Sequence, residues 1–487
     1  MRKLHRIYIA LVVVSILLIR FSEAVAAGYE IKVRIQGLSD TECYLGNHYG
    51  DKQYVKDTVR VDKNGWMTFS GKEPLDGGIY LIVLPNKTYF ELLIGDEQNF
   101  TVETDTLDYV GHLKVTGSLE NRLFNEHQKF LMEKGVENQA LKSRMEANKN
   151  NKDSVAAIRK EMTAMDKEVK DYRLQLVQDY PKTFMAKIII TMQEPEVPEP
   201  PKDDKGNVLD SNFQFNYYKA HFLDNVDFSD ERLLRSPLLY NKVKTYTQQL
   251  TVPVPDSIIP SVDTIIFRSR ANKEVFKYNV ATLANYYETS NIMGYDKVFV
   301  HIAENYYLTD EAYWADSSLK VKIQERVNKI KPNILGTPAY NLTMLDTSLK
   351  ISNNTLVAGT LKYISLYDIK AKYTVLVFWD PTCSHCKVEV PELYHIYDSL
   401  KSKGVSIEVY SVGIESDPEL WKEFIRKNKL NWINVTDPAN QTHFRDYYDI
   451  YSTPVIYLLD EQKRIIAKRL DPGKVRDFIA REYNQKK

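Results

Sequence analysis

The fold of the C-terminal part of this chain is decided by the stretch TVLVFWDPTCSHC, residues 374–386. Residues 374–378 are all β-branched or apolar, which predicts a strand buried on both faces of a sheet. The residues after Cys386 follow helical spacing, so Cys383 and Cys386 lie where a buried strand leads into the first turn of a helix. Their spacing places both sulfurs on one helix face, close enough to form a disulfide.

This position predicts redox chemistry for the two thiols. A helix N-terminus carries partial positive charge and free N–H groups, which stabilise a thiolate. A thiolate of low pKa beside a second thiol is what thiol–disulfide exchange requires. We expect Cys383, at the helix start, to attack the substrate and Cys386, deeper in the helix, to resolve the mixed disulfide. The alternatives are an inert disulfide and a structural zinc half-site, although no second close pair of cysteines or histidines completes a zinc site.

The pattern strand–Trp–x–x–x–Cys–x–x–Cys–helix resembles the thioredoxin superfamily. Pro391 lies where thioredoxins place a proline in this helix. Thr453-Pro454 precedes an apolar run and looks like the cis-proline loop that faces the two cysteines in that family. Glu389 matches the carboxylate of the exported TlpA/ResA-like branch. Val377 departs from the thioredoxin pattern, which has a buried Asp there, so the resemblance moves the acid–base role to Glu389.

Two residues beside the cysteines have candidate roles in the chemistry. Glu389 would exchange protons with Cys386, and its alternative is a charge on the helix surface. His385, when protonated, would stabilise the Cys383 thiolate, and its alternative is a spacer that faces solvent.

Three further residues are assigned to substrate binding. Thr453 and Pro454 would present backbone groups to an extended substrate, or else form an ordinary turn before a strand. Trp379 is grouped with them, although packing beside the active loop is its simpler role. We expect no metal and no cofactor besides the redox-active disulfide Cys383–Cys386.

Composition limits the remaining possibilities. The 487 residues suggest two to four domains, and 65 basic residues balance 65 acidic ones, so no overall charge favours nucleic acid as a partner. The chain has only three cysteines, which excludes a scaffold held by several disulfides. The third, Cys43, lies in a short strand-like run and is interpreted as a small core residue rather than a third redox thiol.

The first 26 residues predict a secretory signal peptide. A basic start precedes an apolar run at 7–19, and Ala24-Val25-Ala26 supplies a cleavage site of small residues. The run is too short to span a bilayer, although an uncleaved membrane anchor is the alternative. We therefore expect an exported, periplasmic protein with no transmembrane segment in the mature chain.

The rest of the chain predicts a multidomain protein with three parts. Residues 27–117 alternate as strands between turn signals, which predicts an all-β sandwich or barrel. Residues 118–330 are mostly helical and begin with two long antiparallel helices. Residues 331–487 predict an α/β thioredoxin-like domain. The β-rich and helical parts resemble domains found ahead of TlpA-like domains in the Bacteroides group.

Together these features predict an exported thiol–disulfide oxidoreductase, most simply a reductase of protein disulfides. An oxidising compartment keeps accessible dithiols oxidised, so a reductase also implies a membrane electron donor. The alternatives are an isomerase or oxidase at the same site, a peroxidase, and a binding protein whose N-terminal domains recognise a partner. The peroxidase is disfavoured because Asp380 stands where the peroxiredoxin pattern has Thr or Ser.

Overall fold

The computed structural model describes residues 28–346, 349–352, 355–358, 362–414 and 417–485. The predicted signal peptide lies outside the described residues. Among the helices within them, none is both long and apolar enough to cross a membrane. The chain forms two compact units, Met1–Thr251 with Phe267–Phe276, and Val252–Ile266 with Lys277–Lys487.

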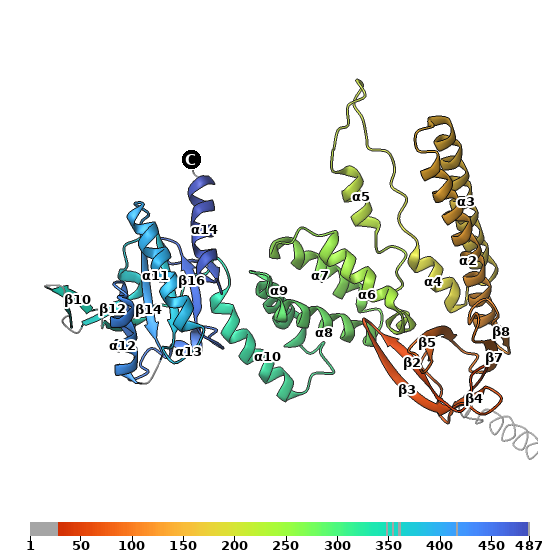
Figure 1. The fold of residues 1–487 in the computed structure, drawn as a ribbon, viewed down its shortest axis with the longest axis horizontal. Coiled ribbons are helices and arrows are strands. Elements are labelled where there is room, and N and C mark those ends of the chain that lie inside the picture. Colours follow the sequence, from red (N-terminus) through yellow and green to blue (C-terminus); the bar gives the residue numbers. More distant parts are fainter. Residues whose placement is uncertain (1–27, 347–348, 353–354, 359–361, 415–416, 486–487) are drawn as a thin grey trace, which may run out of the picture. The chain divides into compact units, whose positions relative to one another are not determined.

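The first unit begins with two four-stranded sheets that enclose one hydrophobic core (Figure 1). Every second side chain of β1 is buried, because alternate residues of a strand face the same side. The two sheets confirm the predicted all-β N-terminal part, and of its two predicted forms, sandwich and barrel, they form the sandwich. Cys43 is fully buried in this core, as expected, and burial raises its pKa to about 11. The sheet orders are β4 (Trp66–Gly71), β1 (Tyr29–Gln36), β7 (Asn99–Asp105), β8 (Lys114–Thr116), and β3 (Lys52–Arg60), β2 (Glu42–Tyr49), β5 (Gly78–Val83), β6 (Tyr89–Ile94).

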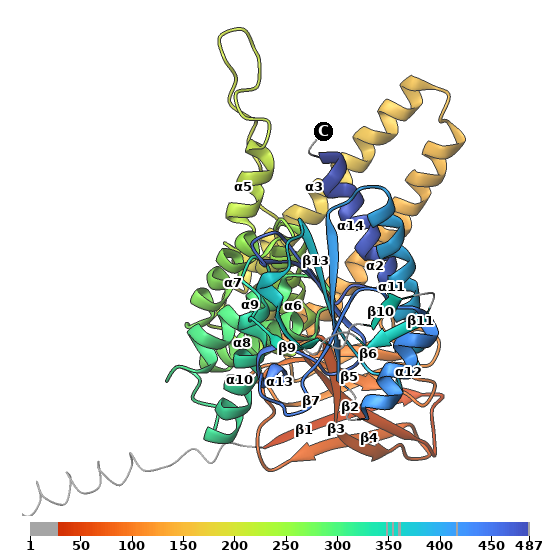
Figure 2. The same ribbon diagram turned by 90° about the vertical axis from the view of Figure 1, so that its left-hand side faces the viewer.

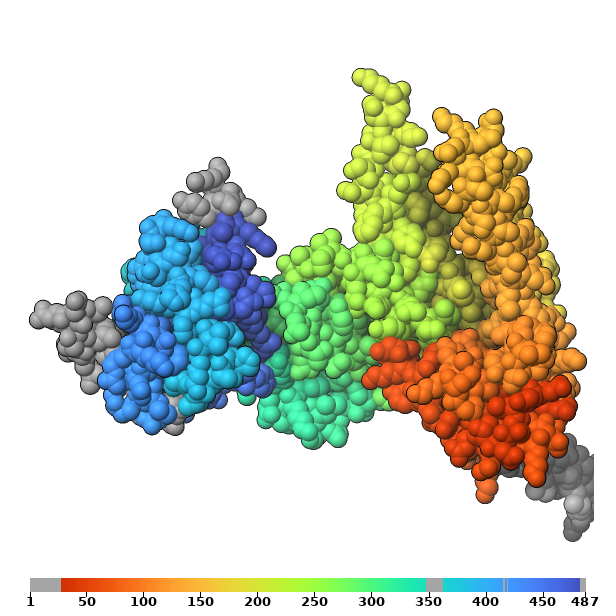
Figure 3. Space-filling model, in the orientation of Figure 1, coloured from red at the N-terminus to blue at the C-terminus, as the bar shows by residue number. Residues whose placement is uncertain are grey.

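Two long helices, α2 (Leu119–Ala147) and α3 (Lys152–Asp179), follow the sandwich and confirm the predicted helix pair. Each helix starts at a cap, because the side chains of Ser118 and Asn151 accept hydrogen bonds from backbone N–H groups of the first turn. In the space-filling view the pair projects beyond the sandwich (Figure 3). The unit also contains α4 (Phe184–Met192), α5 (Phe213–His221), η1 (Glu231–Arg235), α6 (Pro237–Lys244) and η2 (Thr245–Gln249).

The second unit combines helices with a mixed seven-stranded sheet (Figures 1 and 2). All seven residues of the strand β13 are buried, which confirms the strand predicted ahead of the cysteines. β13 runs parallel to β14 and antiparallel to β16. The sheet order is β12 (Lys362–Ser365), β9 (Thr343–Asp346), β15 (Ile433–Thr436), β14 (Ile407–Gly413), β13 (Tyr373–Trp379), β16 (Val455–Leu459), β17 (Ile465–Lys468). A separate hairpin pairs β10 (Leu349–Ser352) with β11 (Thr355–Ala358).

Helices cover both faces of the seven-stranded sheet. Val377 and Trp379 share a core with side chains of α11 (Cys386–Ser402), α12 (Pro418–Asn428) and α14 (Pro472–Gln485). Phe378 faces the opposite core, because successive strand side chains alternate, and there it meets α13 (Phe444–Tyr447). The arrangement is the predicted α/β fold. The helices ahead of the sheet are α7 (Pro255–Ser269), α8 (Lys273–Thr289), α9 (Tyr295–Ile302), η3 (Ala303–Tyr307), α10 (Ser317–Ile330) and η4 (Lys331–Asn333), and η5 (Leu366–Asp368) precedes β13.

One helix is shorter than the sequence indicates. We expect a helix over 440–448, but α13 covers only Phe444–Tyr447. Asn440 and His443 have φ values of 50° and 47°, a left-handed conformation that does not continue a helix. The carboxylate of Asp437 instead accepts hydrogen bonds from the backbone N–H groups of Gln441 and Thr442, which holds this segment as a loop.

Candidate active site

The two cysteines lie in the connection between β13 and α11. The side chain of Asp380 accepts hydrogen bonds from the backbone N–H and the hydroxyl of Thr382, at 2.7 and 2.6 Å. This turn delays the helix, which begins at Cys386 and not at Cys383 as expected. Cys383 therefore lies in the turn just before the helix, although its carbonyl still accepts a hydrogen bond from the N–H of Lys387 at 3.2 Å.

Cys383 is the more exposed and more acidic of the two thiols. Its Sγ–H donates to the carbonyl oxygen of Thr453 at 3.2 Å. The backbone N–H of Cys386 and the side chain of Thr453, followed by the backbone N–H of His385, lower the pKa of Cys383 to about 7. Hydrogen bonds to sulfur favour its charged form, so the thiolate is well populated near neutral pH.

Cys386 has the opposite environment. Its side chain is fully buried, and its sulfur accepts a hydrogen bond from the N–H of Asp380 at 3.5 Å. Burial raises the pKa of Cys386 to about 12, because the interior disfavours a charged sulfur. Both residues are free thiols in the structure. The two thiols therefore differ as their predicted roles require. Cys383 is accessible and acidic enough to attack a substrate, and Cys386 is protected until it resolves the mixed disulfide.

We expect the reduced protein to show one low thiolate step near pH 7 in absorbance, which belongs to Cys383. Cys386→Ser should keep this step near its original pH, because the backbone N–H that lowers the pKa remains in the variant. Cys383→Ser should remove the step. The rate of attack on a small disulfide should rise with pH through the same midpoint, since the thiolate is the nucleophile. A wild-type midpoint above about 8.5, the ordinary value for cysteine, would contradict this assignment.

The loop before β16 faces the cysteines, as the Thr453 contact shows. The Thr453–Pro454 peptide bond is cis, which confirms the resemblance of this loop to the thioredoxin one. A hollow of about 420 Å³ adjoins it. Its lining residues are Glu389, Asp449, Tyr451, Ser452, Pro454, Val455, Arg469, Leu470 and Asp471.

Glu389 and His385 lie on either side of the start of α11. Glu389 is half-buried and lines the hollow beside Pro454. Burial raises the pKa of its carboxyl group, with His385 opposing the rise and Asp471 adding to it. The His385 side chain is exposed, and it is its backbone N–H that acts on the Cys383 sulfur.

Trp379 lies in the core and not at the surface, so it is not placed to contact substrate. Its side chain has no exposed surface, and its Nε1–H donates to the hydroxyl of Ser411 at 2.6 Å. Its ring packs on Phe424 with the centroids 4.9 Å apart. A fully buried side chain contacts no docking protein, so packing replaces substrate binding as its role.

Arg326 and Asp449, which hold the cis-proline loop in place, were not indicated by the sequence. Asp449 has only 7% of its side chain exposed and accepts a hydrogen bond from Nη1 of Arg326 at 3.0 Å. The same Arg326 nitrogen donates to the hydroxyl of Tyr451 at 2.9 Å, while Nε donates to Glu288 at 3.1 Å. Arg326 belongs to α10, so a helix ahead of the sheet holds the loop that carries Thr453 and Pro454.

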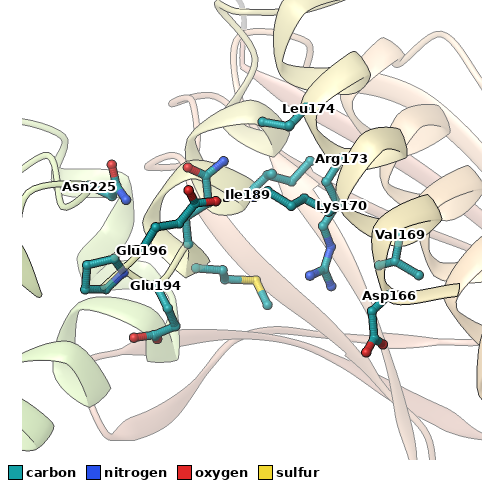
Figure 4. A pocket seen from close by; sticks show the side chains of 12 residues that line it. Asp166, Val169, Lys170, Arg173, Leu174, Ile189, Glu194, Glu196 and Asn225 are labelled. Atoms are coloured by element: carbon teal, nitrogen blue, oxygen red, sulfur yellow. Dashed lines mark hydrogen bonds and ion pairs between the residues drawn. The ribbon is translucent and has the colours of Figure 1, made fainter. Parts of the chain in front are cut away.

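A second hollow, of about 760 Å³, lies in the first unit between α3, α4 and the segment 193–196 (Figure 4). Figure 4 shows the guanidinium of Arg173 pointing into it, and Nε of this group donates to His127 at 3.4 Å. Burial lowers the pKa of His127 to about 4, so its neutral ring accepts the bond. The residues that line this hollow include no cysteine or histidine.

Within the described residues, no cluster of His, Cys, Asp and Glu is arranged to hold a metal ion.

Three stretches of the chain match known protein families. Residues 345–468 match the AhpC/TSA family. Residues 29–124 match a domain of unknown function, DUF4369, and residues 142–333 match another, DUF5106. The predicted boundaries at 117 and 330 stay predictions.

Among curated proteins, the chain is similar to sporulation thiol-disulfide oxidoreductase A of Bacillus subtilis, at 31% identity over 104 residues, which is 21% of this chain and 62% of that protein. It is also similar to thiol-disulfide oxidoreductase ResA of Bacillus cereus, at 27% identity over 107 residues, or 22% of this chain and 60% of the relative. The chain thus spans about three fifths of the length of these relatives.

Two solved structures are also similar. A domain of a possible thiol-disulfide isomerase from Cytophaga hutchinsonii has 42% identity and a TM-score of 0.27, with 31% of this chain and 95% of that one covered. A thioredoxin-like protein from Bacteroides caccae has 20% identity and a TM-score of 0.45, with 59% and 99% covered.

Proposed function

We propose that this chain, whose C-terminal part belongs to the TlpA/ResA-like branch of the thioredoxin superfamily, exchanges thiols and disulfides through Cys383 and Cys386. The observation that carries the proposal is the asymmetry of the two thiols, one with a pKa of about 7 and one with a pKa of about 12. The names of the curated relatives support the same chemistry.

In the proposed reaction, the Cys383 thiolate attacks one sulfur of a substrate disulfide. A Cys383–substrate bond forms, the substrate S–S bond breaks, and the leaving sulfur takes up a proton. Cys386 then loses its proton and attacks the Cys383 sulfur, which releases the second substrate thiol and leaves a Cys383–Cys386 disulfide. Two electrons pass from the cysteine pair to the substrate. Glu389 is the proposed proton acceptor for Cys386, because it lies one turn into the same helix and burial raises its carboxyl pKa above the ordinary value.

The proposed direction is reduction of protein disulfides. Each turnover leaves the cysteine pair oxidised, so a donor must return two electrons, and a membrane donor suits an exported protein. Export itself rests on the signal peptide proposed for residues 1–26. An isomerase or oxidase would use the same two cysteines with a different redox partner.

The stabilised thiolate also predicts the reduction potential. Stabilising the thiolate stabilises the reduced protein, so we expect a potential between those of thioredoxin, about −270 mV, and protein disulfide isomerase, about −180 mV. His385→Pro should lower the potential, because proline lacks the backbone N–H that acts on Cys383. His385→Ala keeps that N–H and separates its effect from that of the ring. Equilibration with glutathione measures the reduction potential of the wild type and of both variants. A wild-type potential below about −300 mV contradicts the expectation.

Reduction of insulin by dithiothreitol tests the proposed function. The chain without residues 1–26 should accelerate the reduction, and the double variant Cys383→Ser/Cys386→Ser should not. Cys43→Ser should leave the rate unchanged, because Cys43 is buried in the sandwich core. If wild type and double variant give equal rates, the oxidoreductase proposal fails and the binding-protein alternative, with the hollow beside Arg173 as its candidate site, replaces it.

A further inference from the structure

A third hollow, of about 460 Å³, lies next to the one beside Pro454. The two hollows share the lining residues Asp449, Arg469 and Leu470, so they meet at a common wall. The outer hollow is lined on its other side by the end of α8, the segment 290–294, the start of α9 and by α10. The hollow beside Pro454 therefore continues into a part of the chain that matches a domain of unknown function.

Buried ion pairs fix this outer wall against the redox domain. Arg326 of α10 has 19% of its side chain exposed and bonds both Asp449 and Tyr451 of the loop that leads to Thr453. Lys468 of β17 has 9% of its side chain exposed, pairs with Asp296 of α9, and donates to the carbonyl of Asn333 at 2.5 Å. The helices thus keep a set position relative to the cis-proline loop.

The lining of the outer hollow combines paired charges with apolar side chains. Its main charges pair with each other or with neighbours, as Arg326 does with Glu288 and Lys474 with Asp471. Apolar surface remains available, because Ile292 is 52% exposed and Met293 is 39% exposed. At the inner hollow, Tyr451 is 68% exposed. A ligand that reaches from one hollow to the other would gain apolar contacts at both ends.

We propose that the end of α8, the segment 290–294 and the residues of α9 and α10 that line the outer hollow form the outer half of the substrate groove, and that the groove takes an extended polypeptide segment of a disulfide-bearing protein. The cysteine of that segment lies at Cys383 and Pro454, and an apolar side chain further along it packs on Ile292 and Met293. Because the two hollows share a wall, one continuous segment of extended chain, which advances roughly 3.3 Å per residue, can occupy both. This inference rests on the proposed function and adds a preference for unfolded proteins over small disulfides.

The test compares two substrates of the full chain without residues 1–26. Oxidised, unfolded ribonuclease offers apolar side chains along an extended chain, whereas glutathione disulfide has no apolar side chain to place on Ile292 and Met293. The double variant Ile292→Glu/Met293→Glu should raise KM for the protein substrate about 10-fold, because charge replaces the apolar surface, with kcat unchanged. The rate with glutathione disulfide should not change.

Val321→Glu is the matched control, because Val321 is 56% exposed on α10 but lines neither hollow. It should leave KM for both substrates unchanged. The proposed groove is wrong if the double variant and this control have equal KM values for the protein substrate. It is also wrong if the double variant loses activity equally with the protein substrate and with glutathione disulfide. An inactive wild type would contradict the proposed function itself, so the two failures are distinguishable.

Discussion

Cys386→Ser is expected to accumulate covalent complexes with substrate proteins in nearly stoichiometric amount. The Cys383 thiolate, with a pKa of about 7, can still attack, but the thiol that releases it is gone. Turnover of insulin should fall to the uncatalysed rate, because each protein molecule stops after its first attack. Non-reducing gels should show bands of higher mass that disappear with reductant, and mass spectrometry of these bands identifies the substrates.

The reverse variant provides the control for this trap. Cys383→Ser leaves Cys386 as the only cysteine of the pair, and because Cys386 is fully buried with a pKa of about 12, the variant should form few complexes. The double variant should form none, and any that remain would point to Cys43. If Cys386→Ser folds normally but traps nothing, the exchange mechanism is wrong.

Much of this site could be predicted because its determinants are local in sequence. The buried strand, the turn and both cysteines lie within residues 374–386, where the change from an apolar run to helical spacing is visible. Thr453-Pro454 was also recognisable from the apolar run after it. The sequence predicts that α11 begins at Cys383, but the helix begins one turn later, at Cys386, because the hydrogen bonds from Thr382 to Asp380 compete with the helix.

The part that the sequence concealed depends on contacts between distant residues. Arg326 and Asp449 are 123 positions apart, and no local pattern relates them. An arginine on an amphipathic helix and an aspartate in a loop each have the composition of solvated surface. Burial of Asp449 becomes visible only when α10 packs against the loop. The same holds for Trp379, whose burial depends on α12 packing over β13.

Asp449→Ala is expected to cost about 3 kcal/mol of unfolding free energy. The substitution leaves the largely buried Arg326 without its main partner on the loop, and it also removes the ion pair with Arg469. Asp449→Asn keeps an acceptor oxygen for Arg326 and should cost less. Urea unfolding followed by tryptophan fluorescence is a suitable measurement, because three of the five tryptophans lie in this domain's core.

The control for this variant is Glu419→Ala, which breaks an exposed pair with Lys422 and should cost less than about 1 kcal/mol. Asp449→Ala should also raise the pKa of Cys383, since a loosened loop weakens the hydrogen bond from Thr453 to its sulfur. The rate of attack near pH 7 should then fall, because less thiolate is present. If Asp449→Ala matches the control in stability and leaves the Cys383 titration unchanged, Arg326 does not position the cis-proline loop.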